Sequence, residues 1–259
     1  TNDTSATLKV VGALLTTGVL NANAPNNTIH YNGSGTQTIK VPASSTYYNL
    51  KLENASAKTA GGAITVNGDF TMNGDASFNG GTSLTHTFLG NWIISTTAAT
   101  PYVYTTAGTI NFNTPGTPAA TSISGTSTTG LVFSSVSINN TSGFSTNQDM
   151  SIAGTLTVAS SVAFTPDAGV VISGSGTLTG NGTVRITRTA PTAEMNSQYT
   201  ITTKTLTNLT AEYFAGSAQT ISALTYGGLK INNSANVSLG GNVTVNGIPM
   251  NDAESHGTW

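Results

Sequence analysis

The sequence predicts an all-β protein, a parallel β-solenoid built from degenerate strand-turn modules, with tandem β-sandwich domains as the alternative. Three observations support this fold class. Apolar and polar residues alternate over short stretches such as 49–52 and 242–246, which is typical of strands with one buried face and one wet face. Asn-Gly, Gly-Gly and Gly-Ser-Gly turns separate these stretches. The chain also repeats itself, as a solenoid requires.

The composition favours strands over helices. Only 7% of the 259 residues are charged, whereas a soluble domain usually carries about 25%. Water solubility must therefore come from Thr, Ser, Asn and Gly, which suit strands and tight turns. We predict no helix. The 37% apolar content and its alternation argue against a disordered chain.

The repeat is clearest between residues 46–68 and 225–247, which agree at 11 of 23 positions when laid together without a gap. A looser copy begins at Phe133, and a partial copy begins at Leu8. Strand-turn-strand segments with an aromatic residue precede the fuller copies; they span 28–39, 109–123 and 209–221. The asparagines that we expect to stack as amide ladders at the corners are Asn54, Asn140 and Asn233.

The modules grade into one another without a Pro-rich or charged linker. A solenoid explains this better than sandwiches do, because each coil needs only to match its neighbours and insertions become loops. The predicted divisions are N-terminal capping or joining strands at 1–27, a repeat solenoid at 28–247 with modules near 28–80, 109–165 and 209–247, and a C-terminal tail or joining segment at 248–259.

Charge and cysteine content exclude several classes of function. The net charge is −2 and the eight basic residues are spread along the chain, so no cationic stripe is available for nucleic acid. The absence of Cys excludes disulfides, thiolate metal sites and a Cys nucleophile. No apolar run approaches the roughly 20 residues of a membrane span. Because the chain begins at Thr1 and not at Met, we expect a mature product that has lost a signal peptide.

The best candidate for a metal site is the segment Asn-Gly-Asp-Phe-Thr-Met-Asn-Gly-Asp. It sets Asp69 and Asp75 six residues apart, with Asn67 and Asn73 beside them. Oxygen ligands at turns suit Ca²⁺, so Asp69 and Asp75 are predicted calcium ligands. The alternative is that Asn-Gly-Asp is simply good turn chemistry.

The remaining ionisable residues form no recognisable constellation. His30, His86 and His256 have no metal-binding spacing, and we expect them at surface or turn positions. Arg185 and Arg188 are three apart on a strand and should point to opposite faces. One of them is expected to form a surface ion pair. The predicted acidic partners are Glu194 and Glu212.

Two surface features suggest that the protein binds a ligand. Trp92 and Tyr102 to Tyr104 are candidates for sugar stacking, but Trp92 alternates with apolar neighbours and is expected in the core. Thr-x-Thr pairs suggest an ice-binding face, which needs one pair per coil at constant spacing. Their irregular intervals favour ordinary outward strand residues instead. The pairs are Thr36/Thr38, Thr85/Thr87, Thr155/Thr157, Thr177/Thr179, Thr187/Thr189, Thr200/Thr202 and Thr205/Thr207.

A family resemblance is found in residues 31–93. This segment begins "YNGSGTQTI" and contains "GGAITVNGDFTMNGDASFNGG". It resembles the repeats of large secreted, adhesin-like surface proteins of Bacteroidetes and related gliding bacteria. The stretch 180–247, beginning "GNGTVRITRT", is similar to the same group. The resemblance implies export to the cell surface and a structural or adhesive role, and it implies no catalytic residues.

Together these observations predict a secreted, extracellular or cell-surface structural or adhesive protein and not an enzyme. We expect copies to associate through their terminal coils into a fibre, because exposed solenoid ends leave strand edges unpaired. A glycan-binding or ice-binding solenoid is the alternative, with surface glycans as partners. A polysaccharide-degrading enzyme is less favoured, since the ten acidic residues are scattered.

Overall fold

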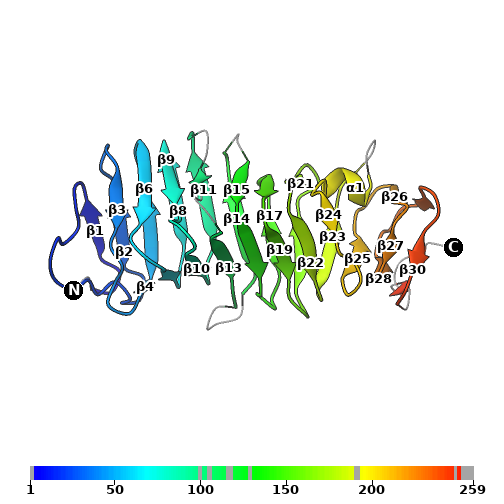
Figure 1. Cartoon of the computed structure of the whole chain (residues 1–259), viewed down its shortest axis with the longest axis horizontal. Coiled ribbons are helices and arrows are strands. Elements are labelled where there is room, and N and C mark those ends of the chain that lie inside the picture. Colours follow the sequence, from blue (N-terminus) through cyan, green and yellow to red (C-terminus); the bar gives the residue numbers. More distant parts are fainter. Residues whose placement is uncertain are drawn as a thin grey trace.

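The computed structural model describes residues 3–98, 101–103, 107–114, 119–127, 130–189, 193–247 and 250–251. It confirms the predicted fold class: the chain is a parallel β-solenoid of about 11 turns. The coils follow one another along a single long axis, with β1 at one end and β30 at the other (Figure 1). Within the described ranges, no helix is long and apolar enough to cross a membrane.

Each coil contributes strands to three faces, which we call sheets 1, 2 and 3. Sheet 1 runs the length of the molecule and has twelve strands in the described part of the chain. Its strands are β1 (Thr7–Val10), β2 (Thr28–Tyr31), β5 (Asn49–Leu52), β8 (Phe70–Gly74), β11 (Trp92–Thr96), β14 (Thr121–Gly125), β17 (Phe144–Thr146), β20 (Ala163–Pro166), β23 (Thr183–Ile186), β25 (Thr210–Tyr213), β28 (Gly228–Ile231) and β31 (Met250–Asn251).

Sheet 2 has eight hydrogen-bonded strands among the described residues, and a further pair of strands takes the same place in the C-terminal coils. The eight are β4 (Thr46–Tyr47), β7 (Thr65–Val66), β10 (Thr85–Phe88), β13 (Thr109–Phe112), β16 (Ser135–Ile138), β19 (Thr155–Val158), β22 (Thr177–Gly180) and β24 (Thr203–Lys204), and the pair is β27 (Thr225–Tyr226) and β30 (Thr244–Val245).

Sheet 3 is broken into three groups of strands. They are β3 (Gln37–Ile39), β6 (Ser56–Ala60), β9 (Ala76–Asn79) and β12 (Tyr102–Val103); β15 (Leu131–Phe133), β18 (Met150–Ile152) and β21 (Ile172–Ser173); and β26 (Gln219–Ile221) with β29 (Val237–Leu239). One helical turn, α1 (Met195–Gln198), stands between β21 and β26 in this face.

The helical turn α1 was not predicted. Its Gln198 is fully buried and ties neighbouring segments together. The amide oxygen accepts the Thr187 N–H at 2.8 Å, and the amide nitrogen donates to the Thr187 hydroxyl at 2.8 Å and to the Asp167 carbonyl at 3.1 Å. Four residues are too few to carry a helical period, so no sequence pattern signals this turn.

The core consists of inward-facing rows with one residue per coil. One row of sheet 1 runs from Leu8 through Ile29, Leu50, Phe70 and Trp92. Leu8 is 37% exposed because no coil covers it, whereas the other four are fully buried. The rings of Phe70 and Trp92 lie 4.9 Å apart. Burial of each large apolar side chain contributes about 1.5–3 kcal/mol to the free energy of folding. Because each row is buried by stacking one coil on the next, contacts between neighbouring coils supply most of the stability.

The close repeat occupies equivalent places in the solenoid. Residues 46–68 form β4, β5, β6 and β7, and residues 225–247 form β27, β28, β29 and β30. Both copies pass through sheets 2, 1, 3 and 2 in that order. The repeated unit is therefore one coil followed by the first strand of the next.

The looser copies, by contrast, are displaced by one face. The alignment of Phe133 with Tyr226 matches β16 of sheet 2 to β28 of sheet 1, and the alignment of Leu8 matches β1 of sheet 1 to β7 of sheet 2. The predicted equivalence of these copies is wrong. All three faces use alternating apolar residues followed by an Asn or Gly corner, so a loose template does not distinguish one face from another.

The corner asparagines tie each coil to the one before it. Asn140 and Asn233 are buried, and their amide nitrogens donate to the carbonyls of Ala119 at 2.8 Å and Ser217 at 2.9 Å. Asn54, at a φ of 65°, donates to a carbonyl of the preceding coil at 2.6 Å. The three amides thus bond the backbone of the preceding coil and do not stack on one another.

Candidate functional site

The two predicted calcium ligands lie at opposite ends of one strand. Asp69 directly precedes β8 and Asp75 directly follows it. An extended segment of this length spans about 20 Å, so the two carboxylates do not share an ion. The Asp69 carboxylate accepts the Asn91 N–H at 3.2 Å, and Asp75 accepts the Thr97 hydroxyl. Among the described residues, no three His, Asp or Glu side chains cluster as metal ligands.

His86 is fully buried, so the expectation of a surface or turn position is wrong for it. Its Nε2 lies 2.7 Å from the Gly80 carbonyl, and its Nδ1 accepts the Ile64 N–H at 3.3 Å. These partners require the neutral tautomer with the proton on Nε2. Burial lowers the pKa of His86, so the imidazole serves as a neutral bridge between coils. His256 lies outside the described residues.

His30 is also buried, although it lies on the outward side of sheet 1. Its Nε2 is 2.8 Å from Glu53 Oε2, and Lys51 Nζ is 3.3 Å from Glu53 Oε1. Burial, followed by the charge of Lys51, lowers the pKa of His30, despite the opposing effect of Glu53. The register places Lys9, His30 and Lys51 side by side on β1, β2 and β5.

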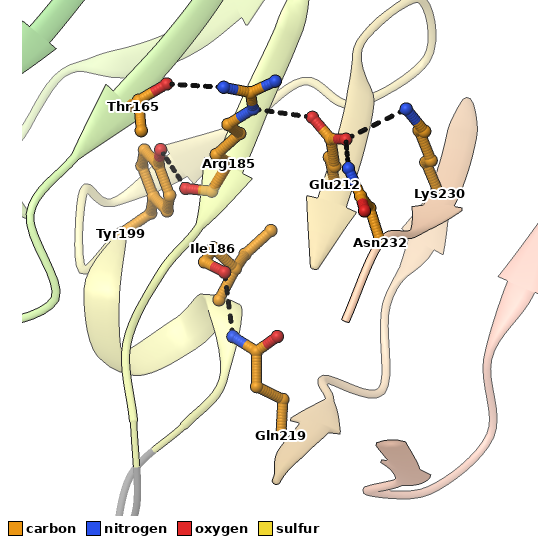
Figure 2. Close-up of polar contacts among 8 residues, drawn as sticks. All are labelled: Thr165, Arg185, Ile186, Tyr199, Glu212, Gln219, Lys230 and Asn232. Atoms are coloured by element: carbon orange, nitrogen blue, oxygen red, sulfur yellow. Dashed lines mark hydrogen bonds and ion pairs between the residues drawn. The ribbon is translucent and has the colours of Figure 1, made fainter. Parts of the chain in front are cut away.

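Arg185 forms the predicted ion pair with Glu212, but the pair is not a surface pair. Arg185 Nε lies 2.7 Å from Glu212 Oε2, and the Glu212 side chain is only 2% exposed (Figure 2). Arg188 instead donates to the Ser197 carbonyl at 3.2 Å. Glu194 accepts the Ser222 hydroxyl at 3.0 Å. The two arginines therefore bind different partners, a buried carboxylate and a backbone carbonyl.

Glu212 is the centre of a polar cluster that crosses three neighbouring strands. Lys230 Nζ lies 3.1 Å from Glu212 Oε1, and Asn232 Nδ2 donates to the same oxygen at 3.0 Å (Figure 2). Burial alone would raise the pKa of Glu212, but hydrogen bonds from Arg185, Asn232 and Lys230 outweigh it and hold the pKa below its usual value. The carboxylate is therefore charged and fully compensated.

A row of ionisable residues on sheet 1 leads into each close repeat, and only its last member, Lys51 or Lys230, lies within the repeat itself. The register aligns Arg185, Glu212 and Lys230 on β23, β25 and β28, just as it aligns Lys9, His30 and Lys51 near the N-terminus. Interior strands of sheet 1 carry uncharged residues at the matching positions, such as Thr71 after Lys51. The two lysines thus recur with the repeat, and the other ionisable residues of each row lie on the strands that precede it.

A buried tyrosine pair is duplicated in the same way. Tyr213 Oη lies 3.0 Å from Tyr226 Oη and accepts the Ser222 N–H at 2.9 Å. Tyr31 Oη lies 3.4 Å from Tyr47 Oη and accepts a backbone N–H at 2.9 Å. Two coils 179 to 182 residues apart thus preserve polar contacts as well as apolar ones. We interpret this conservation within one chain as architectural.

Of the candidate sugar-stacking aromatic residues, the structure describes the side chain of Trp92 alone. Trp92 is fully buried, as expected, so it offers no platform. The Tyr102 side chain and Tyr104 are outside the described part of the chain. Phe214 is 37% exposed instead, and the Arg185 guanidinium carbon lies 4.3 Å from its ring centre. Phe214 lines a hollow of about 450 Å³, together with Asp167, Asn232 and other residues.

Three of the seven predicted threonine pairs lie on sheet 2, and two of these are direct neighbours although the sequence intervals between the pairs are irregular. Thr155 and Thr157 on β19 are the register partners of Thr177 and Thr179 on β22. Insertions lie in the loops between strands, so they change the sequence interval without changing the register. Irregular sequence intervals therefore do not decide against a threonine array on sheet 2. The pairs Thr36/Thr38, Thr187/Thr189, Thr200/Thr202 and Thr205/Thr207 lie outside the strands of that sheet.

The N-terminal coil closes the solenoid only in part. In the described part of the chain, β1 pairs with β2 alone and β3 pairs with β6 alone. Val11 and Val19 are 72% and 70% exposed. A hollow of about 410 Å³ separates the segment 11–16 from the region of β3. This end therefore presents apolar side chains beside unpaired strand edges.

The C-terminal coil leaves its core rows open. Among the described residues, β29 pairs only with β26 and β30 only with β27. Leu239 stacks on buried Ile221 but is 62% exposed. Val237 and Val245 pack against the core and are only partly buried. Interior coils bury the matching rows completely.

In the comparisons with known proteins, no protein family, no curated protein and no solved structure matches this chain.

Proposed function

We propose that this chain is an extracellular structural or adhesive surface protein whose copies join end to end into a fibre. The observation that supports the proposal most is that, among the described residues, both ends of the solenoid leave inward-facing apolar residues uncovered beside unpaired strand edges. Such edges promote pairing between chains unless they are blocked. The absence of Cys and the low charge agree with secretion.

The two ends are suited to a head-to-tail contact. Because the coils stack in parallel, the last coil of one copy faces the first coil of the next in the same sense as two neighbouring coils within a chain. A contact between different surfaces of identical copies does not close on itself, so it propagates as a filament. The row that ends at Ile221 and Leu239 would continue onto the exposed valines of the next copy.

The experiment adds a charge to either side of one terminal strand. Leu239 faces the open core and its neighbour Ser238 faces outward, so Leu239→Lys and Ser238→Lys introduce the same charge on opposite sides of β29. We expect filaments of wild type and of Ser238→Lys in negative-stain microscopy, and dispersed particles of Leu239→Lys. Monomeric wild type at every soluble concentration, or equal filament loss in both variants, would contradict the proposal.

For the adhesive part of the role, the hollow beside Phe214 supports contact with surface glycans. An exposed ring held by Arg185 offers a stacking platform, and the Asp167 carboxylate on the rim can accept sugar hydroxyls. In a glycan array, Phe214→Trp should retain binding and Phe214→Leu should lose it. Equal binding by both variants would exclude this hollow as the glycan site.

A further inference from the structure

We infer that the outer face of sheet 2 is an ice-binding surface. This face lies along the side of the solenoid and not at its ends, so its residues differ from those of the proposed fibre contact. The face carries a lattice of small hydroxylated side chains that becomes visible only when the strand register is known.

Two rows of outward-facing residues run across sheet 2, one residue per strand. Thirteen positions in these rows carry ten threonines, two serines and one asparagine. The first row is Thr46, Thr65, Thr87, Asn111, Ser137, Thr157 and Thr179. The second row is Thr85, Thr109, Ser135, Thr155, Thr177 and Thr203. Thr225 and Thr244 continue the same composition on β27 and β30.

The spacing of the lattice follows from strand geometry. Neighbouring strands lie about 4.8 Å apart, and residues two apart on one strand are separated by about 6.7 Å. The first row therefore extends for about 29 Å. Register partners follow one another without a bulge from β10 to β22. The result is a two-dimensional grid of hydroxyl and methyl groups on one face of a rigid sheet.

Buried residues fix the grid from below. Each outward residue alternates with an inward one, as Thr155 and Thr157 alternate with Leu156 and Val158, both fully buried. Threonine is β-branched and its side-chain rotamer is restricted in a strand. The surface therefore loses little conformational entropy when it meets an ordered partner.

The threonine hydroxyls of the grid remain available for water, whereas the two serine hydroxyls accept hydrogen bonds within the chain, Ser135 from the Thr155 N–H at 3.1 Å and Ser137 from the Asn139 amide at 3.0 Å. Among the ten threonines, only Thr46 donates a side-chain hydrogen bond, to the Ser44 carbonyl at 2.9 Å, within the part of the chain that the structure describes. The threonines are exposed or half-buried. They can order water with their hydroxyls while their methyl groups fill the spaces between.

The chemistry of the face selects an uncharged, periodic partner. None of the thirteen positions carries a charge, whereas sheet 1 carries Arg185, Glu212 and Lys230 on its outward side. A charged polymer would find no counter-charge at these thirteen positions. A repeating grid gains most binding free energy from a partner that repeats on a similar scale in two dimensions. The surface of an ice crystal offers such a lattice of neutral hydrogen-bond donors and acceptors.

The experiment places a bulky residue in the grid and the same residue on another face. Thr157→Tyr disrupts the first row and Thr177→Tyr the second, while Thr71→Tyr adds the same ring to the outer side of sheet 1, where Thr71 lies between Lys51 and Ile93. Tyrosine is well tolerated in strands. Unchanged circular dichroism and thermal unfolding would show that each variant is folded.

We expect wild type and Thr71→Tyr to give thermal hysteresis and to inhibit ice recrystallisation, and both sheet 2 variants to lose most of these activities. An inactive wild type would overturn the inference, and so would equal losses in all three variants. Binding of wild type to microcrystalline cellulose or chitin without any effect on ice would assign the face to a polysaccharide lattice and overturn the ice assignment. Leu239→Lys tests the fibre separately, because it leaves both rows intact.

Discussion

Replacing the buried carboxylate of Glu212 by an amide tests the polar cluster that joins three coils of sheet 1. Glu212→Gln keeps the shape of the side chain but removes the charge that compensates Arg185 and Lys230. The glutamine amide can still accept one hydrogen bond, and it brings an N–H₂ group toward donors that already face the site. The variant should therefore fold and be less stable.

The expected decrease in the free energy of unfolding follows from the burial of Glu212, Arg185 and Lys230. Removing one partner of a fully buried ion pair costs about 3–5 kcal/mol. Here the Arg185 and Lys230 side chains are 28% and 27% exposed, so water partly solvates the charges that remain, and we expect about 2–3 kcal/mol. For a chain of this size, that corresponds to a fall in Tm of roughly 5–10 °C.

Glu53→Gln is the matched control for thermal unfolding followed by circular dichroism. Glu53 pairs with His30 and Lys51 on the same side of sheet 1, but its side chain is 31% exposed, and an exposed pair contributes about 0–1 kcal/mol. We therefore expect a much smaller shift in Tm. Equal shifts in the two variants, or no shift in Glu212→Gln, would refute the argument from burial.

Three further predictions concern the coil interior. Burial lowers the pKa of His86, so at about pH 6 the folded chain binds fewer protons at this residue than the unfolded chain does. Tm should therefore fall as the pH drops below about 6.5. An NMR titration should find the imidazole neutral at that pH. Tyr213→Phe leaves a buried N–H without its acceptor and should cost about 1–3 kcal/mol, while Tyr48→Phe, whose residue is half-buried, should cost less in the same denaturant titration. Gly180 has a φ of 134°, and a Cβ added there would collide with a backbone carbonyl oxygen of the preceding coil, so Gly180→Ala should lower Tm, whereas Gly169→Ala, with open space around it, should not.

The fold was predictable because its determinants are local and repeated. Alternation in stretches such as 49–52 reports one buried face, and the close repeat identified one whole coil without knowledge of any contact. Because the strands of all three sheets share one alternating pattern, the sequence did not show to which sheet each strand of the looser copies belongs. For example, β16 and β28 share a pattern but lie in different sheets. The single turn α1 left no periodic signal.

The candidate sites were less predictable, because they depend on which coils become neighbours. The sequence left Glu194 and Glu212 open as partners of the two arginines, and only the register shows that Arg185, 27 residues earlier, lies beside Glu212. His86 is buried because its two ring nitrogens find backbone partners in the loop and the coil beside it. The threonine rows are a matter of register as well, and the loop insertions that disguise them in the sequence have no effect on the sheet.

In the proposed fibre, the open-ended coils of one chain continue into those of the next. Cryo-electron microscopy of wild-type assemblies tests it most directly. We expect a filament with strands across its axis, a rise of about 4.8 Å per coil and, from about 11 coils per chain, a subunit repeat of about 53 Å. Dispersed particles, or filaments in which subunits touch through their sides, would contradict it.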